Sequence, residues 1–323
     1  AAYKTLKGQS VRQVAQDPTN PLLGEIWYNT TTGSLKGYSF IADAWANGGA
    51  LNTGRASGGG AGAQTTALYF GGQYDPTARA ITEEYNGSTW SEQNDMNQAR
   101  VYMGATGTQT AALGAGGRNQ GPPGPESNNV EEYNGSSWAN ATVMPTATYF
   151  PRMCGPQTAA LGAGGYQGYY PGADINTTYL YDGTNWTTGN NLNNSKQWGG
   201  AVGTQTAALV AGAYPNSGQT EEYNGTNWTS VNSMGSGRYF IGAFGTQTSA
   251  VYAGGGSGSK ANTERYDGTN WSATTNLTTG RRLSEGGLMS PSEAGIVMAG
   301  VPNSNLTEEF TGTTTQARII TTS

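Results

Sequence analysis

Short runs of small and apolar residues alternate with turn-forming residues along the whole chain. Runs such as Ala111–Gly116 have the length of a β-strand and end at glycine, asparagine or aspartate. At five places a tyrosine is followed by Asn-Gly or Asp-Gly, pairs that tolerate the positive φ angles of a two-residue type I′ hairpin turn. No apolar run approaches the roughly 20 residues that a membrane-spanning helix needs. The pattern predicts an all-β chain with almost no helix.

Two sequence blocks recur with one shared period. The block Tyr-Asn/Asp-Gly-x-x-Trp has a weaker relative at Tyr38–Trp45 and a decayed copy that starts at Phe310. Its tryptophans, which lie 45, 48, 48, 42 and 43 residues apart, are Trp45, Trp90, Trp138, Trp186, Trp228 and Trp271. The block Gly-Thr-Gln-Thr-Ala-Ala-Leu, followed by Gly-Gly, is cleanest at Gly107–Gly117 and has six copies. Such regular repetition indicates a repeat protein.

A third repeated feature is a cationic residue ten residues after each tryptophan, and we call this place the register position. The members are Arg55, Arg100, Lys196, Arg238 and Arg281, with Thr148 as the exception. Each unit is interpreted as four antiparallel strands, of which the first two are rich in alanine and glycine. Small residues suit inner strands that crowd toward an axis, and a tryptophan on the outer strand can fill the space between neighbouring sheets. We therefore expect a β-propeller of six four-stranded blades.

The Gly-Gly pair, the tyrosine, the tryptophan and the following arginine resemble the kelch repeat over roughly residues 50 to 312. Kelch rings are usually closed by a strand from one terminus, and the spacing from Trp45 to Arg55 places Trp45 where such a strand should lie. The expected division is an N-terminal arm and hairpin at 1–48 and a propeller at 49–323. Seven blades are the alternative, with Glu25–Asn29, Leu35–Phe40, Trp45 and Ala317–Ser323 as the extra strands.

Composition narrows the classes of function. The 323 residues carry a net charge of −5 with only 16 lysines and arginines, so we expect neither nucleic acid nor an anionic membrane as a partner. Cys154 is the only cysteine, which excludes an intrachain disulfide, and we expect it to be a small core residue. Histidine is absent, which removes the usual general base and the usual zinc ligand. Kelch-like rings include galactose-oxidase-like enzymes, whose copper centre requires two histidines, so the resemblance does not imply that chemistry here. We expect no cofactor, no metal and no enzymatic activity.

Paired glutamates recur in repeat register, and two interpretations are open. As a ring of carboxylates they could hold a cation. As structural groups they would pair with the register cations and bond between strands, which their repeat position favours. The pairs are Glu83-Glu84, Glu131-Glu132, Glu221-Glu222 and Glu308-Glu309.

Loops between the second and third strands of each unit vary in sequence and should emerge on one face, where binding sites are common. Their tyrosines could stack on sugar rings or cover an apolar patch of a partner. The candidates are Tyr74, Tyr166, Tyr169, Tyr170 and Tyr214. The alternative is that tyrosine, with 19 copies, is simply frequent in this chain.

The segment Pro21–Tyr38 resembles the short β-hairpin of structural proteins of tailed bacteriophages. Together with the Thr-Gln-Thr-Ala-Ala-Leu repeats and the Glu308–Gly312 segment, it is similar to kelch-like virion proteins of marine phages. The resemblance implies a virion-surface protein used for decoration or adhesion to host glycans, held by its N-terminal segment to other virion proteins in a symmetric assembly. The alternative is a free, secreted carbohydrate-binding module.

Overall fold

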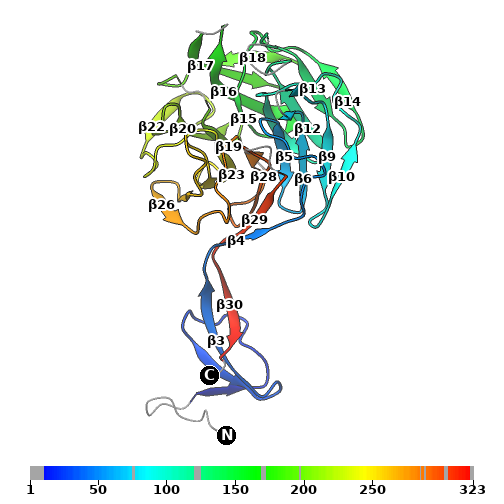
Figure 1. The fold of residues 1–323 in the computed structure, drawn as a ribbon. Coiled ribbons are helices and arrows are strands. Elements are labelled where there is room, and N and C mark those ends of the chain that lie inside the picture. The colour runs from blue at the N-terminus through cyan, green and yellow to red at the C-terminus, as the bar shows by residue number, and fades with distance from the viewer. Residues whose placement is uncertain are drawn as a thin grey trace. The chain divides into compact units, whose positions relative to one another are not determined.

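The computed structural model describes residues 11–74, 77–119, 125–168, 172–195, 198–283, 285–286, 289–301 and 305–320. They form two compact units, one of residues 45–311 and the other of residues 1–44 with 312–323. Apart from one 3-10 turn at Gln157–Ala159, the regular elements are β-strands (Figure 1). The predicted all-β fold is confirmed.

The large unit contains six four-stranded sheets, and in the first five of them the four strands pair in chain order from the inner to the outer strand. The first three sheets consist of β5(Gly59–Ala63), β6(Thr66–Phe70), β9(Thr82–Tyr85) and β10(Trp90–Gln93), then β11(Gly104–Thr108), β12(Ala111–Ala115), β13(Val130–Tyr133) and β14(Trp138–Ala141), then β15(Arg152–Cys154), β16(Ala160–Gln167), β17(Ala173–Tyr181) and β18(Trp186–Gly189). The next two consist of β19(Gly200–Thr204), β20(Ala207–Ala213), β21(Ser217–Tyr223) and β22(Trp228–Val231), then β23(Gly242–Thr246), β24(Ser249–Ala253), β25(Thr263–Tyr266) and β26(Trp271–Thr274). A two-stranded ribbon, β7(Gln73–Tyr74) with β8(Thr77–Ala78), lies in the loop that follows β6.

The first strands of the sheets lie toward the centre of the large unit and the fourth strands at its periphery (Figure 1). Adjacent first strands contact one another, and small residues make this approach possible. A Cβ atom on Gly104 would lie only 2.5 Å from the carbonyl oxygen of Pro151, the residue just before β15 of the next sheet. Apolar clusters fill the space between sheets; in one of them Leu68 and Phe70 pack against Ala112 and Trp138. The arrangement is propeller-like.

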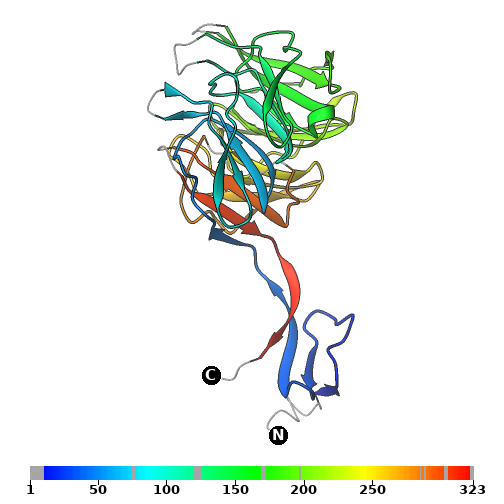
Figure 2. The same cartoon turned by 90° about the vertical axis from the view of Figure 1, so that its right-hand side faces the viewer.

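The sixth sheet combines segments from the two ends of the chain. It consists of β27(Glu285–Gly286), β28(Ala294–Met298), β29(Thr307–Thr311) and, as the outer strand, β4(Ala44–Asn47). Trp45 of β4 is buried, with its ring 5.0 Å from Phe310 and 6.1 Å from Phe244. Figure 2 shows the early and late strands of this sheet side by side. Trp45 thus lies in the strand position that its spacing to Arg55 predicts.

The small unit is a four-stranded sheet in the order β1(Arg12–Val14), β2(Ile26–Asn29), β3(Ser34–Ile41), β30(Thr314–Ile319). The Asp17 carboxylate organises one part of it by accepting hydrogen bonds from the Trp27 indole at 2.9 Å, from Asn29 at 2.8 Å and from Lys36 at 2.6 Å. These bonds, that from Lys36 above all, lower the pKa of Asp17 to about 2.

This sheet differs from the sequence-based division at 48/49. Residues 312–323, which the repeat pattern assigned to the propeller, belong to the small unit, because β30 pairs with β3. Three of the strands considered for a seventh blade do share a sheet, but its fourth strand is β1 and Trp45 lies elsewhere. Repeat spacing could not reveal this, since β3 and β30 are at opposite ends of the sequence and carry no common motif.

Candidate functional site

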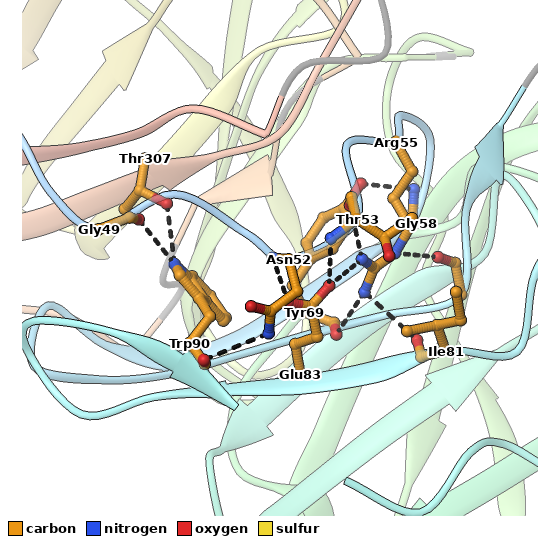
Figure 3. Close-up of polar contacts among 11 residues, drawn as sticks. Gly49, Asn52, Thr53, Arg55, Gly58, Tyr69, Ile81, Glu83, Trp90 and Thr307 are labelled. Carbon is orange, nitrogen blue, oxygen red and sulfur yellow. Dashed lines mark hydrogen bonds and ion pairs between the residues drawn. The ribbon is translucent and has the colours of Figure 1, made fainter. Parts of the chain in front are cut away.

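The register arginines are buried and form ion pairs inside their own sheets. Arg100 contacts Glu131 at 3.0 Å, and Arg238 contacts Glu264 at 2.9 Å. Arg55 pairs in the same way with Glu83, as Figure 3 shows, and Arg281 pairs with Glu308. Other guanidinium N–H groups donate to backbone carbonyls; Arg100, for example, donates to Gly116 and Asn129. Lys196 lies outside the described residues.

The second glutamate of each pair reaches the neighbouring sheet. Tyr133 donates its hydroxyl hydrogen to Glu84 at 3.0 Å. Equivalent bonds join Tyr181 to Glu132, Tyr266 to Glu222 and Tyr85 to Glu309, at 2.8, 2.8 and 2.6 Å. Among the described residues no group of three acidic or sulfur ligands is placed to hold a metal ion. The glutamate pairs are thus engaged in structural contacts within and between sheets.

The repeat tryptophans and glutamines make further bonds between sheets. The indole N–H of Trp138 donates to Thr82 at 2.9 Å, and Trp228, Trp271 and Trp90 donate in the same way to Thr178, Thr220 and Thr307. Trp186 donates instead to the carbonyl of Thr142, since Val130 stands where the other sheets have threonine. The amide of Gln109 donates to two carbonyls of the preceding sheet, those of Ala67 and Tyr85. The repeat motif is therefore largely a set of contacts between sheets.

We expect Tyr133→Phe to lower the free energy of unfolding by about 1 kcal/mol, the net value of a partly exposed hydrogen bond to a carboxylate. Tyr223→Phe is the matched control, because Leu180 occupies the position of the acceptor glutamate and the Tyr223 hydroxyl has no hydrogen-bond partner among the described residues. Urea unfolding of both variants measures the difference. Equal stability changes in the two would show that the tyrosine–glutamate bonds contribute nothing.

An arginine and a glutamate lie close together at the inner strands, four residues after the register position. Four sheets have glycine there, at Gly59, Gly104, Gly200 and Gly242, whereas the third and sixth sheets have Arg152 and Glu285. A guanidinium nitrogen of Arg152 lies 4.0 Å from a carboxylate oxygen of Glu285. They line a cavity of about 20 Å³, room for about one water molecule. Burial raises the pKa of Glu285 to about 7, although the nearby Arg152 opposes the shift.

The raised pKa of Glu285 predicts a specific dependence of stability on pH. The folded state holds a proton on Glu285 up to about pH 7, whereas the unfolded chain releases it near 4.5. Stability contributed by Glu285 is therefore full below pH 4.5 and is lost as the pH rises to about 7, by about 3 kcal/mol in total. Glu285→Gln should remove this change, so that the variant exceeds the wild type in stability at pH 8. Unfolding free energies of both proteins between pH 4.5 and 8 test this, and parallel curves would contradict it.

The residues two positions after the register cation adopt left-handed backbone conformations. They are Ser57, Tyr102, Phe150, Trp198, Phe240 and Leu283, with φ between 55° and 64°. Backbone bonds link successive members, for example Tyr102 N–H to the Ser57 carbonyl at 2.8 Å and Phe150 N–H to the Tyr102 carbonyl at 2.7 Å. Bulky residues rarely adopt this conformation, and strained backbone of this kind concentrates at functional sites. The end of the large unit at which these six residues lie is therefore a candidate for a functional site.

Aromatic side chains gather at this end and form what we call the axial aromatic cluster. Its rings contact one another at centroid distances from 4.5 to 6.5 Å. The members are Tyr102, Tyr149, Phe150, Tyr166, Trp198, Tyr214, Tyr239 and Phe240. Arg118 stacks over one of them, Tyr149, at 4.0 Å. The cluster is the candidate binding site of the large unit.

The structure brings two of the five predicted binding tyrosines into this cluster. Tyr166 is buried against Tyr149, and Tyr214 is 45% exposed beside Trp198. Tyr74 is 48% exposed but lies on the β7–β8 ribbon, without a ring contact among the described residues. Tyr169 and Tyr170 lie outside the described residues. Sequence reasoning missed Trp198 and Phe240, although their shared position, two residues after the register cation, was available as a signal.

Comparisons with known proteins bear on the fold alone. No family model and no curated protein matches this chain. A solved structure titled "Structure of YjhT" is similar with a TM-score of 0.64 and 13% identity, and the match covers 83% of this chain and 99% of that one. None of the helices among the described residues has the length and apolar character needed to span a bilayer.

Proposed function

We propose that this chain is a non-enzymatic structural protein of a phage virion, in which a propeller is displayed for decoration or for adhesion to host-surface glycans. The observation that carries the proposal is the division into two units. The small unit contains the hairpin that resembles phage structural proteins, and it is built from both ends of the sequence, separately from the repeats. It is the part suited to attach to other virion proteins.

We infer that the six sheets of the large unit close into a six-bladed ring. Contacts that join neighbouring sheets also join the first sheet to the sixth. Tyr85 bonds to Glu309, Trp90 to Thr307, and the Gln64 amide to the Phe310 carbonyl at 2.8 Å. The strands β27 and β28 also contact β5. Because the bonds between the first and sixth sheets match those between other neighbouring sheets, they support a closed ring, and β4 completes its sixth sheet.

The non-enzymatic part of the proposal rests on how the reactive side chains are used. The repeat carboxylates are engaged by arginine, tyrosine and backbone groups. The thiol of Cys154 is buried, and burial raises its pKa to about 12, so it is a poor nucleophile near neutral pH. A rigid ring with its charges paired internally is suited to presentation and binding.

Removing the small unit alone tests the proposed attachment. A variant of residues 44–311 keeps β4 and all six sheets of the large unit, and we expect it to unfold cooperatively like the full chain but to lose co-sedimentation with the parent phage particle. A variant that lacks only residues 1–10 is the control. Retained co-sedimentation of the 44–311 variant would contradict attachment through the small unit.

A free carbohydrate-binding module is the second candidate, and the axial aromatic cluster favours it. It shares glycan binding with the first proposal but predicts no association with particles. Mass spectrometry of purified phage particles separates the two, since a virion protein is recovered in fixed stoichiometry with the capsid and tail proteins.

A further inference from the structure

Arg152 differs from the register arginines in how its guanidinium is bonded. Each of the four register arginines forms a direct ion pair with a glutamate and donates at least two hydrogen bonds to backbone carbonyls. Arg152 is only 8% exposed, but it donates no hydrogen bond to the described residues, and its Nε atom is buried without a partner. The nearest described carboxylate oxygen, on Glu285, lies 4.0 Å away. A buried polar group without partners calls for an explanation.

The guanidinium borders an enclosed space at the centre of the large unit. Arg152 and Glu285 line the cavity of about 20 Å³ described above, and the inner strands of five sheets contribute its wall. The other lining residues are uncharged, and the largest of their side chains are those of Met103, Met153 and Ile241. A space of this volume admits one water molecule or an ion of similar size, and it excludes polyatomic ions.

The Arg152 guanidinium lacks a counter-charge below neutral pH. Burial raises the pKa of Glu285 to about 7, although Arg152 opposes the shift, so its carboxyl group is mostly protonated at pH 6. The other titratable side chains that interact electrostatically with this pair are Tyr69 and Tyr252, and burial raises the pKa of both, so they are neutral. Burial lowers the pKa of Arg152, but a guanidinium keeps its proton in proteins. A water molecule in the cavity can solvate this charge but cannot neutralise it, and an uncompensated buried charge is costly.

We propose that the cavity between Arg152 and Glu285 binds one monovalent anion of about the size of chloride. The anion supplies the counter-charge that Arg152 lacks, and it accepts hydrogen bonds from the guanidinium and from the protonated carboxyl group. Because Arg152 belongs to β15 of the third sheet and Glu285 to β27 of the sixth, the ion also joins these two sheets at the centre of the large unit. This site is independent of the proposed attachment and adhesion.

Chloride is expected to stabilise the full chain beyond its effect as a salt. Urea unfolding is measured at pH 6 in mixtures of sodium chloride and sodium gluconate at constant ionic strength, since gluconate is too large for the cavity. For one site that exists only in the folded state, each tenfold rise in chloride well above the dissociation constant should raise the folding equilibrium constant about tenfold. Bromide should act like chloride. Equal stability in chloride and gluconate overturns the proposal and indicates that the cavity holds water.

Two variants and a matched control assign the chloride effect to this cavity. Arg152→Gly introduces the residue that four other sheets have at this position and should abolish the effect. Arg318→Gln removes an exposed cation of the small unit and should retain the full effect. Between pH 6 and 8 the wild-type affinity for chloride should fall about tenfold as Glu285 ionises, whereas Glu285→Gln should show no such fall. An undiminished chloride effect in Arg152→Gly, or a wild-type affinity that is unchanged at pH 8, contradicts the proposal.

Crystals of the wild-type full chain grown with sodium bromide locate the ion directly, because bromine scatters X-rays anomalously. We expect one anomalous peak within hydrogen-bonding distance of the Arg152 guanidinium. This measurement decides the question even if Arg152→Gly fails to fold, since a map without a peak at this position overturns the proposal.

Discussion

Deletion of residues 1–48 is expected to abolish cooperative folding of the large unit. The deletion removes β4, the outer strand of the sixth sheet, together with buried Trp45. Loss of a large buried aromatic side chain alone costs about 3–5 kcal/mol, and the deletion also leaves the edge of β29 unpaired. These losses approach the whole stability of a typical domain. Circular dichroism and urea unfolding of the variant measure the effect.

The 44–311 variant described above is the control for this deletion, because it lacks the small unit but retains β4. Cooperative unfolding of 44–311 together with loss of folding in the 1–48 deletion would locate the effect in β4. If the 1–48 deletion instead unfolds cooperatively with wild-type stability, β4 is dispensable and the inferred closure is wrong.

Replacing Arg100 by threonine is expected to lower the free energy of unfolding by about 3–5 kcal/mol. The change leaves the buried Glu131 carboxylate without its counter-charge, and an uncompensated buried charge is costly. It also leaves the carbonyls of Gly116 and Asn129 without their donor. Urea unfolding at pH 7 measures the loss.

The third sheet suggests a second substitution that should restore stability to the Arg100→Thr variant. There Thr148 replaces the register cation and Tyr179 replaces the glutamate, and their hydroxyl oxygens lie 3.5 Å apart. Arg100→Thr combined with Glu131→Tyr copies this pair, so the double variant should recover a substantial part of the stability lost in the single one. A double variant less stable than Arg100→Thr alone would indicate that the carboxylate itself, rather than its lost partner, is what the sheet requires.

The repeat made much of the large unit predictable. The tyrosine, Asn-Gly and tryptophan block marks the third and fourth strands because its turn chemistry is local, and the spacing from Trp45 to Arg55 located β4 in the sixth sheet. The ion pairs of Glu83, Glu131 and Glu308 with register arginines could be predicted because both partners lie in one repeat. The sequence also predicted variable loops with tyrosines as a binding face, and it directed attention to Tyr166 and Tyr214.

Contacts between repeats could be determined only from the tertiary structure, because a repeat pattern does not specify which side chain meets which neighbour. The bond from Tyr133 to Glu84 and the approach of Arg152 to Glu285 depend on how sheets face each other across many intervening residues. The pairing of β3 with β30 joins segments without a shared motif. That the Trp198 indole N–H has no hydrogen-bond partner among the described residues is likewise a result of packing that no sequence pattern indicates. By itself, the sequence determined the fold class, the repeat and its strands, whose signals are local and periodic, while the candidate site was decided by three-dimensional neighbours.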